Sequence, residues 1–393
     1  MEKTKKKKQP KMYLPKWLSN IIDVRKVDMQ ILIILLVIVG FGLIMVASSS
    51  YVRSFYDTYN NESGPDSYTY IRSQCFAALI GLIGMTVAAN IDYHILRKFA
   101  NWLLLGTGAL LFVVKVAGIV AGGAQRWMSI GGFSFQPSEI AKFAIILSFS
   151  HYISRNYLHM KKLKIGVLPL FITLILIAGL VAWQPHLSGA IIIFAIGVIL
   201  MFIGGVKFRY FAIPFAAGAT LVAILVSIFP YMRSRIFDTW LNPFENASNE
   251  GYQVVQSLYA IGSGGVFGLG FGQSRQKHLY LPEAHNDYIF SIICEELGFI
   301  GALLVILLFA LLIIRGFYIA MHSKDKFGAL LVFGIISQIA IQAILNIGVV
   351  TNALPSTGIS LPFFSFGGTS LVMLLCEMGV VLSVSKNCYM KKV

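Results

Sequence analysis

The sequence predicts an all-α polytopic membrane protein with about ten transmembrane helices. Hydrophobic residues make up 57% of the 393 residues, charged residues 12%, and the mean hydropathy is +0.75. Typical soluble domains carry roughly 25% charged residues. Because apolar residues outnumber those that a soluble core could bury, we expect lipid and neighbouring helices to cover the rest.

Ten apolar runs approach or exceed the roughly 17–25 residues that a helix needs to cross a bilayer. They are Gln30–Ser48, Gln74–Asn90, Trp102–Val120, Ser138–Ile153, Ile165–Trp183, Leu187–Gly205, Tyr210–Phe229, Asp287–Ile314, Phe327–Val350 and Pro362–Ser385. The longest polar interval, residues 230–286, predicts a large loop between the seventh and eighth helices. We therefore expect a basic tail at 1–29, a single transmembrane domain at 30–385 and a second short tail at 386–393.

Lys and Arg residues gather in the N-terminal tail and in alternate short loops. This distribution predicts that both termini are cytoplasmic and that the loop at 230–286 is extracellular. The same distribution explains the net charge of +15 and argues against a nucleic-acid partner. The four cysteines have no paired spacing, so they indicate neither a disulfide framework nor a metal site.

The stretch from Gly251 to Gly298 is polar and glycine-rich before it becomes a long apolar run. We expect Pro282 in the first turn of that helix and Asp287 close behind it, near the boundary of lipid and water. A carboxylate can stay charged there, whereas at mid-bilayer it would cost roughly 2.5–3.5 kcal/mol. Asp287 is therefore the leading catalytic candidate, and its polar neighbours in this stretch are Gln253, Gln256, Arg275, Lys277, His278, Glu283 and His285.

Charged residues also lie inside the apolar runs. Glu139 and Lys142 are three residues apart, so they share a helix face and can form an ion pair. Lys115, Glu295, Glu296 and Glu377 are expected to turn away from lipid, towards one another or towards a wet cavity. Two interpretations stay open for these groups: ion pairs that fix helix packing, or the lining of a cavity that opens towards Asp287.

The glycines from Gly262 to Gly272 contain a GxGxxG-like pattern. No strand precedes the pattern, which excludes a dinucleotide-binding interpretation. The segment is either a re-entrant loop or a nest of backbone amides, including those of Gly264 and Gly265, for an anion such as pyrophosphate. Arg126 with Trp127, and Arg275 with Lys277, could add positive charge on the same face.

His278, His285 and Glu283 lack the spacing of a dedicated metal site on one helix, and we predict none. A divalent cation such as Mg²⁺ or Mn²⁺ could still be held partly by a substrate pyrophosphate, which needs fewer protein ligands. His186, in the turn QPHLS, is interpreted as a hydrogen-bonded polar group at a helix start.

Four long motifs resemble the SEDS (shape, elongation, division and sporulation) family, the bacterial group that includes FtsW, RodA and SpoVE. The motifs are GAQRWMSIGGFSFQPSEIAK, GYQVVQSLYAIGSGGVFGLGFG, YLPEAHNDYIFSIICEELGFIG and NIGVVTNALPSTGISLPFFSFGGTSL. The segments NPFENASNEGYQ and TGISLPFFSFGG resemble FtsW and SpoVE more than RodA. The family usually has Thr in place of Asn286 and often an acidic residue in place of His186.

This resemblance implies a ten-helix glycosyltransferase of the bacterial cytoplasmic membrane that polymerises lipid II at the outer face. The implied partners are a growing glycan on undecaprenyl pyrophosphate, a class B penicillin-binding protein and other division or sporulation membrane proteins. The family's essential acid maps onto Asp287. Its other motifs map onto Arg126 and Trp127, onto Glu139 and Lys142, and onto the glycines that include Gly264 and Gly265.

In that chemistry a sugar 4-hydroxyl attacks an anomeric carbon and displaces undecaprenyl pyrophosphate, with Asp287 as the general base. Arg126, Lys142, Arg275 and Lys277 are candidates to stabilise the leaving group. Two other functions are considered. A lipid II flippase would need access from both faces, but the polar motifs gather on one. A non-catalytic scaffold of the division complex would tolerate replacement of Asp287.

Overall fold

The computed structural model describes residues 27–59, 64–121, 124–130, 133–212, 239–249 and 251–388, together with positions 216, 220, 227–228 and 234. Within them the chain is mostly helical. The long helices are α2 (Met29–Thr58), α3 (Thr69–Asn90), α4 (Leu96–Ala117), α5 (Pro137–Asn156), α6 (Leu168–Trp183), α7 (Leu187–Ile203), α11 (Ile289–Met321), α12 (Lys326–Val350) and α13 (Gly368–Ser385). A further helix, α10 (Tyr252–Gly264), lies within the expected large loop.

Seven helical segments in the described part of the chain are long and apolar enough to cross a membrane. They include α2, α3, α11, α12 and α13, while α7 is apolar but shorter. The helix α5 carries Glu139, Lys142 and Arg155, which lower its apolar character. The seventh predicted run, Tyr210–Phe229, lies almost wholly outside the described residues. The multi-pass membrane architecture is confirmed.

Three features of the predicted all-α fold were wrong in detail. Residues 119–135 form a three-stranded antiparallel sheet of β1 (Ile119–Ala121), β2 (Ala124–Ile130) and β3 (Phe133–Phe135). Pro282 lies in a series of turns, and α11 begins only at Ile289, because Glu283 takes a left-handed conformation with φ 53°. The last helix begins at Gly368, six residues after the predicted Pro362, since Phe363 has φ 65°. Residues in this conformation interrupt a right-handed helix.

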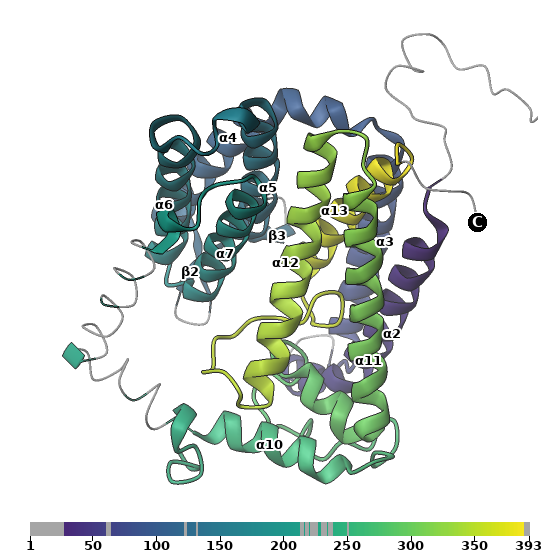
Figure 1. Cartoon of the computed structure of the whole chain (residues 1–393). Helices are drawn as coiled ribbons and strands as arrows, with labels where there is room; N and C mark the ends of the chain where they lie inside the picture. Colours follow the sequence, from purple (N-terminus) through teal and green to yellow (C-terminus); the bar gives the residue numbers. More distant parts are fainter. Residues whose placement is uncertain are drawn as a thin grey trace, which may run out of the picture.

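Helix α12 occupies the middle of the bundle. It packs against α5 and α7 on one side and against α11 and α13 on the other, while α3 runs along α13. Figure 1 shows α4 to α7 gathered on one side of α12 and α2, α3, α11 and α13 on the other, with α10 lying across one end. This arrangement brings α5, α12 and α13 together, although 211 residues separate the end of α5 from the start of α13.

The glycine-rich segment after α10 pairs with a break in α11. Gly298, inside α11, has φ 67°, which interrupts the helical hydrogen bonds. The amides of Leu269 and Gly270 donate to the carbonyls of Glu295 (2.9 Å) and Glu296 (3.0 Å), and the Phe299 amide donates to Gly265 (2.9 Å). These main-chain groups are therefore satisfied by the protein itself, as a membrane environment requires.

We predict that Gly298→Ala destabilises the protein by roughly 3 kcal/mol. A left-handed alanine costs roughly 1–2 kcal/mol, and overpacking adds about 1–3 kcal/mol. The added Cβ would lie 2.3 Å from the amide nitrogen of Gly268. Gly265→Ala is the matched control, because Gly265 also has a positive φ but open space around its Cβ position. Thermal unfolding in detergent should show a larger drop for Gly298→Ala; equal drops would contradict the close packing.

Candidate active site

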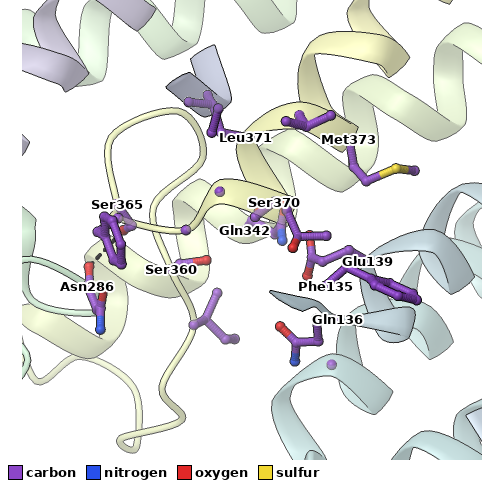
Figure 2. A pocket seen from close by; sticks show the side chains of 18 of the residues that line it. Phe135, Gln136, Glu139, Asn286, Gln342, Ser360, Ser365, Ser370, Leu371 and Met373 are labelled. Atoms are coloured by element: carbon purple, nitrogen blue, oxygen red, sulfur yellow. Dashed lines mark hydrogen bonds between the residues drawn. The ribbon is translucent and has the colours of Figure 1, made fainter. Parts of the chain in front are cut away.

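A cavity of about 1080 Å³ lies where α5, α12 and α13 meet. It is bordered by β2, by the first turn of α7 and by the turn that precedes α11. Figure 2 shows Glu139, Phe135 and Gln136 on one side, with Asn286 and Ser365 on the other. Six residues predicted from the sequence line this one cavity: Arg126, Trp127, Glu139, Lys142, Glu283 and Asp287.

Asp287 lies two residues before α11 begins, in a tight turn in which the amides of Asn286 and Tyr288 both donate to the Glu283 carbonyl, at 3.0 and 3.3 Å. The pKa of the Asp287 carboxyl is raised to about 6, mainly by burial and also by the nearby Glu283 charge, while Arg126 partly offsets this rise. Near pH 7 most of the carboxyl is ionised, yet it is more basic than an exposed aspartate. Such a pKa suits a general base.

Two cations reach the cavity from different elements. Lys142 of α5 forms an ion pair of 2.8 Å with Glu139, and its side chain is 3% exposed. Arg126 of β2 has a buried Nε without a hydrogen-bond partner among the described residues. A buried donor of this kind normally has a partner, so it is available for a ligand oxygen. Arg suits phosphate groups because its guanidinium can donate two parallel hydrogen bonds.

His186 precedes the first turn of α7, at the helix start expected from the sequence. Its Nδ1 accepts from Nε2 of Gln136 at 3.3 Å. Burial lowers the pKa of His186 to about 4, with Arg126 and Lys142 acting in the same direction and Glu139 opposing them. The imidazole is therefore neutral near pH 7 and adds a hydrogen-bonding group without a third positive charge.

Apolar side chains also line the cavity. They include Phe76 and Ile80 of α3, Ile192 of α7 and Met373 of α13. Phe76 and Ile80 are also exposed on the outside of the bundle. One cavity thus combines carboxylates and cations with apolar side chains, two of which are also exposed on the surface of α3.

Lys277, predicted for the site, belongs to a separate buried network around α11, whereas Arg275 is exposed and contributes only its main-chain amide there. The ammonium of Lys277 lies 3.0 Å from Glu296, which also accepts from the Ser48 hydroxyl at 2.7 Å. Glu295 accepts from the Arg275 amide at 2.9 Å. Glu295 and Glu296 turn inward as predicted, and their contacts favour the interpretation that they fix packing.

The other predicted residues also lie outside the cavity lining. Gln256 is on α10, and Gly264 and Gly265 follow at its end, where they pack on α11. His285 packs against the rings of Tyr70 and Phe366, with centroid distances of 4.8 and 5.8 Å. Among the described residues, the structure therefore separates these side chains from the cavity that contains Asp287.

The inward charges outside α11 have different surroundings. Glu377 of α13 is 1% exposed and accepts from Nε2 of Gln338 at 2.9 Å. Lys115 lies in the last turn of α4, above the ring of Trp183 at 5.7 Å. A cation on an aromatic face is stabilised by the ring quadrupole, so this lysine has a partner other than the acid expected.

Sequence reasoning missed several cavity residues on α12 and α13. Gln342 lines the cavity, and Asn346, one turn further along α12, hydrogen-bonds the Asp287 carbonyl at 2.7 Å. Ser365 and Gly358 line it from the loop between the two helices. A signal was present in the sequence, because Gln338, Gln342 and Asn346 recur every fourth residue in an apolar run and so share one helix face.

Comparisons with known proteins identify the family to which this chain belongs. The family described as cell cycle protein (FtsW, RodA, SpoVE) matches residues 28–390. The chain is 38% identical over 365 residues to a probable peptidoglycan glycosyltransferase FtsW from Geobacter sp., covering 91% of this chain and 96% of that one. It is 39% identical over 361 residues to stage V sporulation protein E from Bacillus subtilis, with coverage of 91% and 97%.

Two solved structures resemble the whole chain. One is described as structural coordination of polymerization and crosslinking by a peptidoglycan synthase complex, with a TM-score of 0.74, 26% identity and coverage of 93% of this chain and 99% of that chain. The other, the rod shape determining protein RodA of Thermus thermophilus, has the same fold, with a TM-score of 0.68, 24% identity and coverage of 96% and 100%. The chain belongs to the FtsW, RodA and SpoVE family of cell cycle proteins.

Proposed function

We propose that this protein is a peptidoglycan glycosyltransferase that polymerises lipid II into glycan strands. The observation that carries the proposal is the meeting of Asp287, Arg126 and Lys142 in one cavity, from segments far apart in the sequence. The names of the relatives, which include probable peptidoglycan glycosyltransferases, support the same activity. The cavity offers a base, cations and apolar side chains for a lipid-linked sugar.

In the proposed reaction, Asp287 accepts the proton of the 4-hydroxyl of an incoming lipid II. The oxygen forms a bond to the anomeric carbon of the growing strand, and the bond from that carbon to the pyrophosphate breaks. Undecaprenyl pyrophosphate leaves with the bonding electrons. General-base help of this kind typically accelerates a reaction by about 10²–10⁴-fold.

The leaving pyrophosphate carries the developing negative charge, which Arg126 and Lys142 are placed to stabilise. Glu139, 2.8 Å from the Lys142 ammonium, holds that lysine in place. A single base and an anionic leaving group fit inversion at the anomeric carbon, by analogy with glycoside hydrolysis.

A divalent cation, Mg²⁺ or Mn²⁺, would strengthen the stabilisation of the pyrophosphate. Among the described residues, no group of three or more His, Cys, Asp or Glu side chains is arranged to hold a metal ion. Such a cation would therefore bind mainly through the substrate's phosphate oxygens, with one carboxylate of the cavity as an added ligand.

The proposal places the protein in the bacterial cytoplasmic membrane, with both termini in the cytoplasm and the cavity at the outer face. The alternation of basic loops supports this orientation. The partner proposed is a class B penicillin-binding protein, in septal or sporulation cell-wall synthesis together with other membrane proteins of those assemblies. The similarity to FtsW and to stage V sporulation protein E supports that setting.

The first test replaces Asp287 with asparagine, which keeps the shape and removes the base. Lipid II polymerisation by the purified protein with its cognate penicillin-binding protein should fall by about 10²–10⁴-fold. The control is Asp66→Asn, because Asp66 pairs with Arg72 outside the cavity. Full activity in Asp287→Asn would refute the base assignment, and lipid II transport by a protein that makes no glycan would favour a flippase.

The rate should depend on pH through the raised pKa of Asp287. Since the base works only when ionised, kcat should fall as the pH drops through about 6. An ordinary aspartate would stay active down to about 4. In Glu283→Gln this fall should move to lower pH, because the Glu283 charge raises the pKa of Asp287. A kcat profile that is flat from pH 5 to 8 would contradict the proposed base.

Removal of the Arg126 guanidinium tests the stabilisation of the leaving group. Arg126→Gln should lower kcat by about 10²-fold or more, as loss of one transition-state donor does in other enzymes. Arg72→Gln is the control, since Arg72 pairs with Asp66 outside the cavity. Steady-state kinetics should show the loss in kcat; a change confined to KM would assign Arg126 to ground-state binding.

A further inference from the structure

The turn that carries Asp287 is hydrogen-bonded, residue by residue, to one other part of the chain. The carbonyl of His285 accepts from the Phe366 amide at 2.9 Å. The next carbonyl, of Asn286, accepts from the Ser365 hydroxyl at 2.7 Å, a bond drawn in Figure 2. The carbonyl of Asp287 accepts from Nδ2 of Asn346 at 2.7 Å. Three consecutive carbonyls are thus held from the same side.

The groups that hold these carbonyls belong to the loop between α12 and α13, residues 351–367, and to the helix that leads into it. Asn346 is fully buried, and its Nδ2 also donates to the Ile359 carbonyl at 2.6 Å. The Ser365 hydroxyl accepts from the Leu361 amide at 2.7 Å. The Asn346 amide and the Ser365 hydroxyl thus each make a second hydrogen bond, to Ile359 and from Leu361, which fixes their position relative to the turn.

The same loop also limits the carboxylate itself. Gly358 has φ 61°, and a Cβ added there would lie 3.1 Å from Oδ2 of Asp287. That separation is shorter than an ordinary carbon–oxygen contact, so any side chain at this position would displace the carboxylate or the loop. Gly358 is therefore required for two independent reasons: the backbone conformation and the space that Asp287 occupies.

We infer that Asn346, Ser365 and Gly358 are positioning residues for Asp287. They set where its carboxylate lies in the cavity and act on the reaction through it. The inference rests on the proposed role of Asp287 as the base. The loop 351–367 thereby sets the rate at which Asp287 removes the proton, and it leaves the groups that bind the pyrophosphate unchanged.

The physical reason lies in the sensitivity of proton transfer to geometry. A misplacement of about 1 Å costs on the order of 10²-fold in rate. The carboxylate stands on a turn outside the regular hydrogen bonds of α11, so the helix alone cannot hold it to that tolerance. The hydrogen bonds from Asn346 and Ser365 and the contact with Gly358 supply the missing constraints.

The test is the kinetics of Gly358→Ala in the full-length protein with its cognate penicillin-binding protein. The added Cβ needs the carboxylate to move by a few tenths of an ångström, which is less than the roughly 1 Å that costs on the order of 10²-fold. We therefore expect kcat to fall by about three- to tenfold while the KM for lipid II stays within about twofold. The control is Gly205→Ala, which also places alanine at a positive φ (91°) but has open space around the added Cβ. Gly205 follows α7 and is not part of the cavity lining. It should keep the wild-type kcat.

A second pair of variants covers the case in which Gly358→Ala does not fold. Ser365→Ala removes the hydroxyl that holds the Asn286 carbonyl, and Ser365→Thr keeps a hydroxyl at that position. We expect kcat to fall by about fivefold in the first and to recover in the second, because one neutral hydrogen bond contributes about 1 kcal/mol. A purely structural role would lower the unfolding temperature without this difference in kcat.

The activity of Asp287→Asn, measured in parallel, distinguishes a failure of the proposed base from a failure of the positioning inference. If Asp287→Asn retains activity, the proposed base is wrong and the positioning inference fails with it. If Asp287→Asn is inactive, while folded Gly358→Ala and Ser365→Ala keep the wild-type kcat, the base assignment stands and the positioning inference is overturned.

Discussion

The structure depends on one constraint: backbone groups that leave regular helices inside a membrane protein must find partners within the protein. Two interruptions meet that requirement by pairing with distant loops. The break at Gly298 in α11 is filled by the glycine-rich segment after α10. The turn before α11 is held by Asn346, Ser365 and Phe366. The first pairing supports α11, and the second holds the turn that places Asp287 in the cavity lining.

Acidic residues close together in the sequence therefore have different roles. Glu295 and Glu296 face the segment 272–277 and are neutralised by the Lys277 ammonium and by amide or hydroxyl donors. Asp287, two turns earlier, lies before the helix begins and faces a cavity with Arg126. Glu296 has a cation at 3.0 Å, the Lys277 ammonium. Among the described residues no ion pair joins Asp287 to a cation, and Arg126 acts on it from farther away. Burial, together with the Glu283 charge, raises the pKa of Asp287, and Arg126 offsets this rise only in part.

Much of the fold and part of the site could be predicted from the sequence. The apolar runs located the nine long helices that the structure describes but not α10, and the short spacing of Glu139 and Lys142 predicted their ion pair. The predicted helix starts at Pro282 and Pro362 were wrong, because left-handed residues at Glu283 and Phe363 follow from tertiary contacts that hydropathy does not register. The sheet at 119–135 was missed for a similar reason: its strands are short and stabilised mainly by pairing with each other.

By itself the sequence determined the membrane-protein class and the approximate positions of the long helices, and it made Asp287 the leading catalytic candidate, since hydropathy and local spacing are properties of the chain alone. The tertiary structure decided which polar residues share a cavity with Asp287. It brought in Arg126, Glu139 and Lys142, and it placed Lys277 and His285 elsewhere. The contribution of Asn346 and Gly358 also emerged only there. Both act through contacts that close when α11, α12 and the loop 351–367 pack together, and no local pattern encodes such a contact.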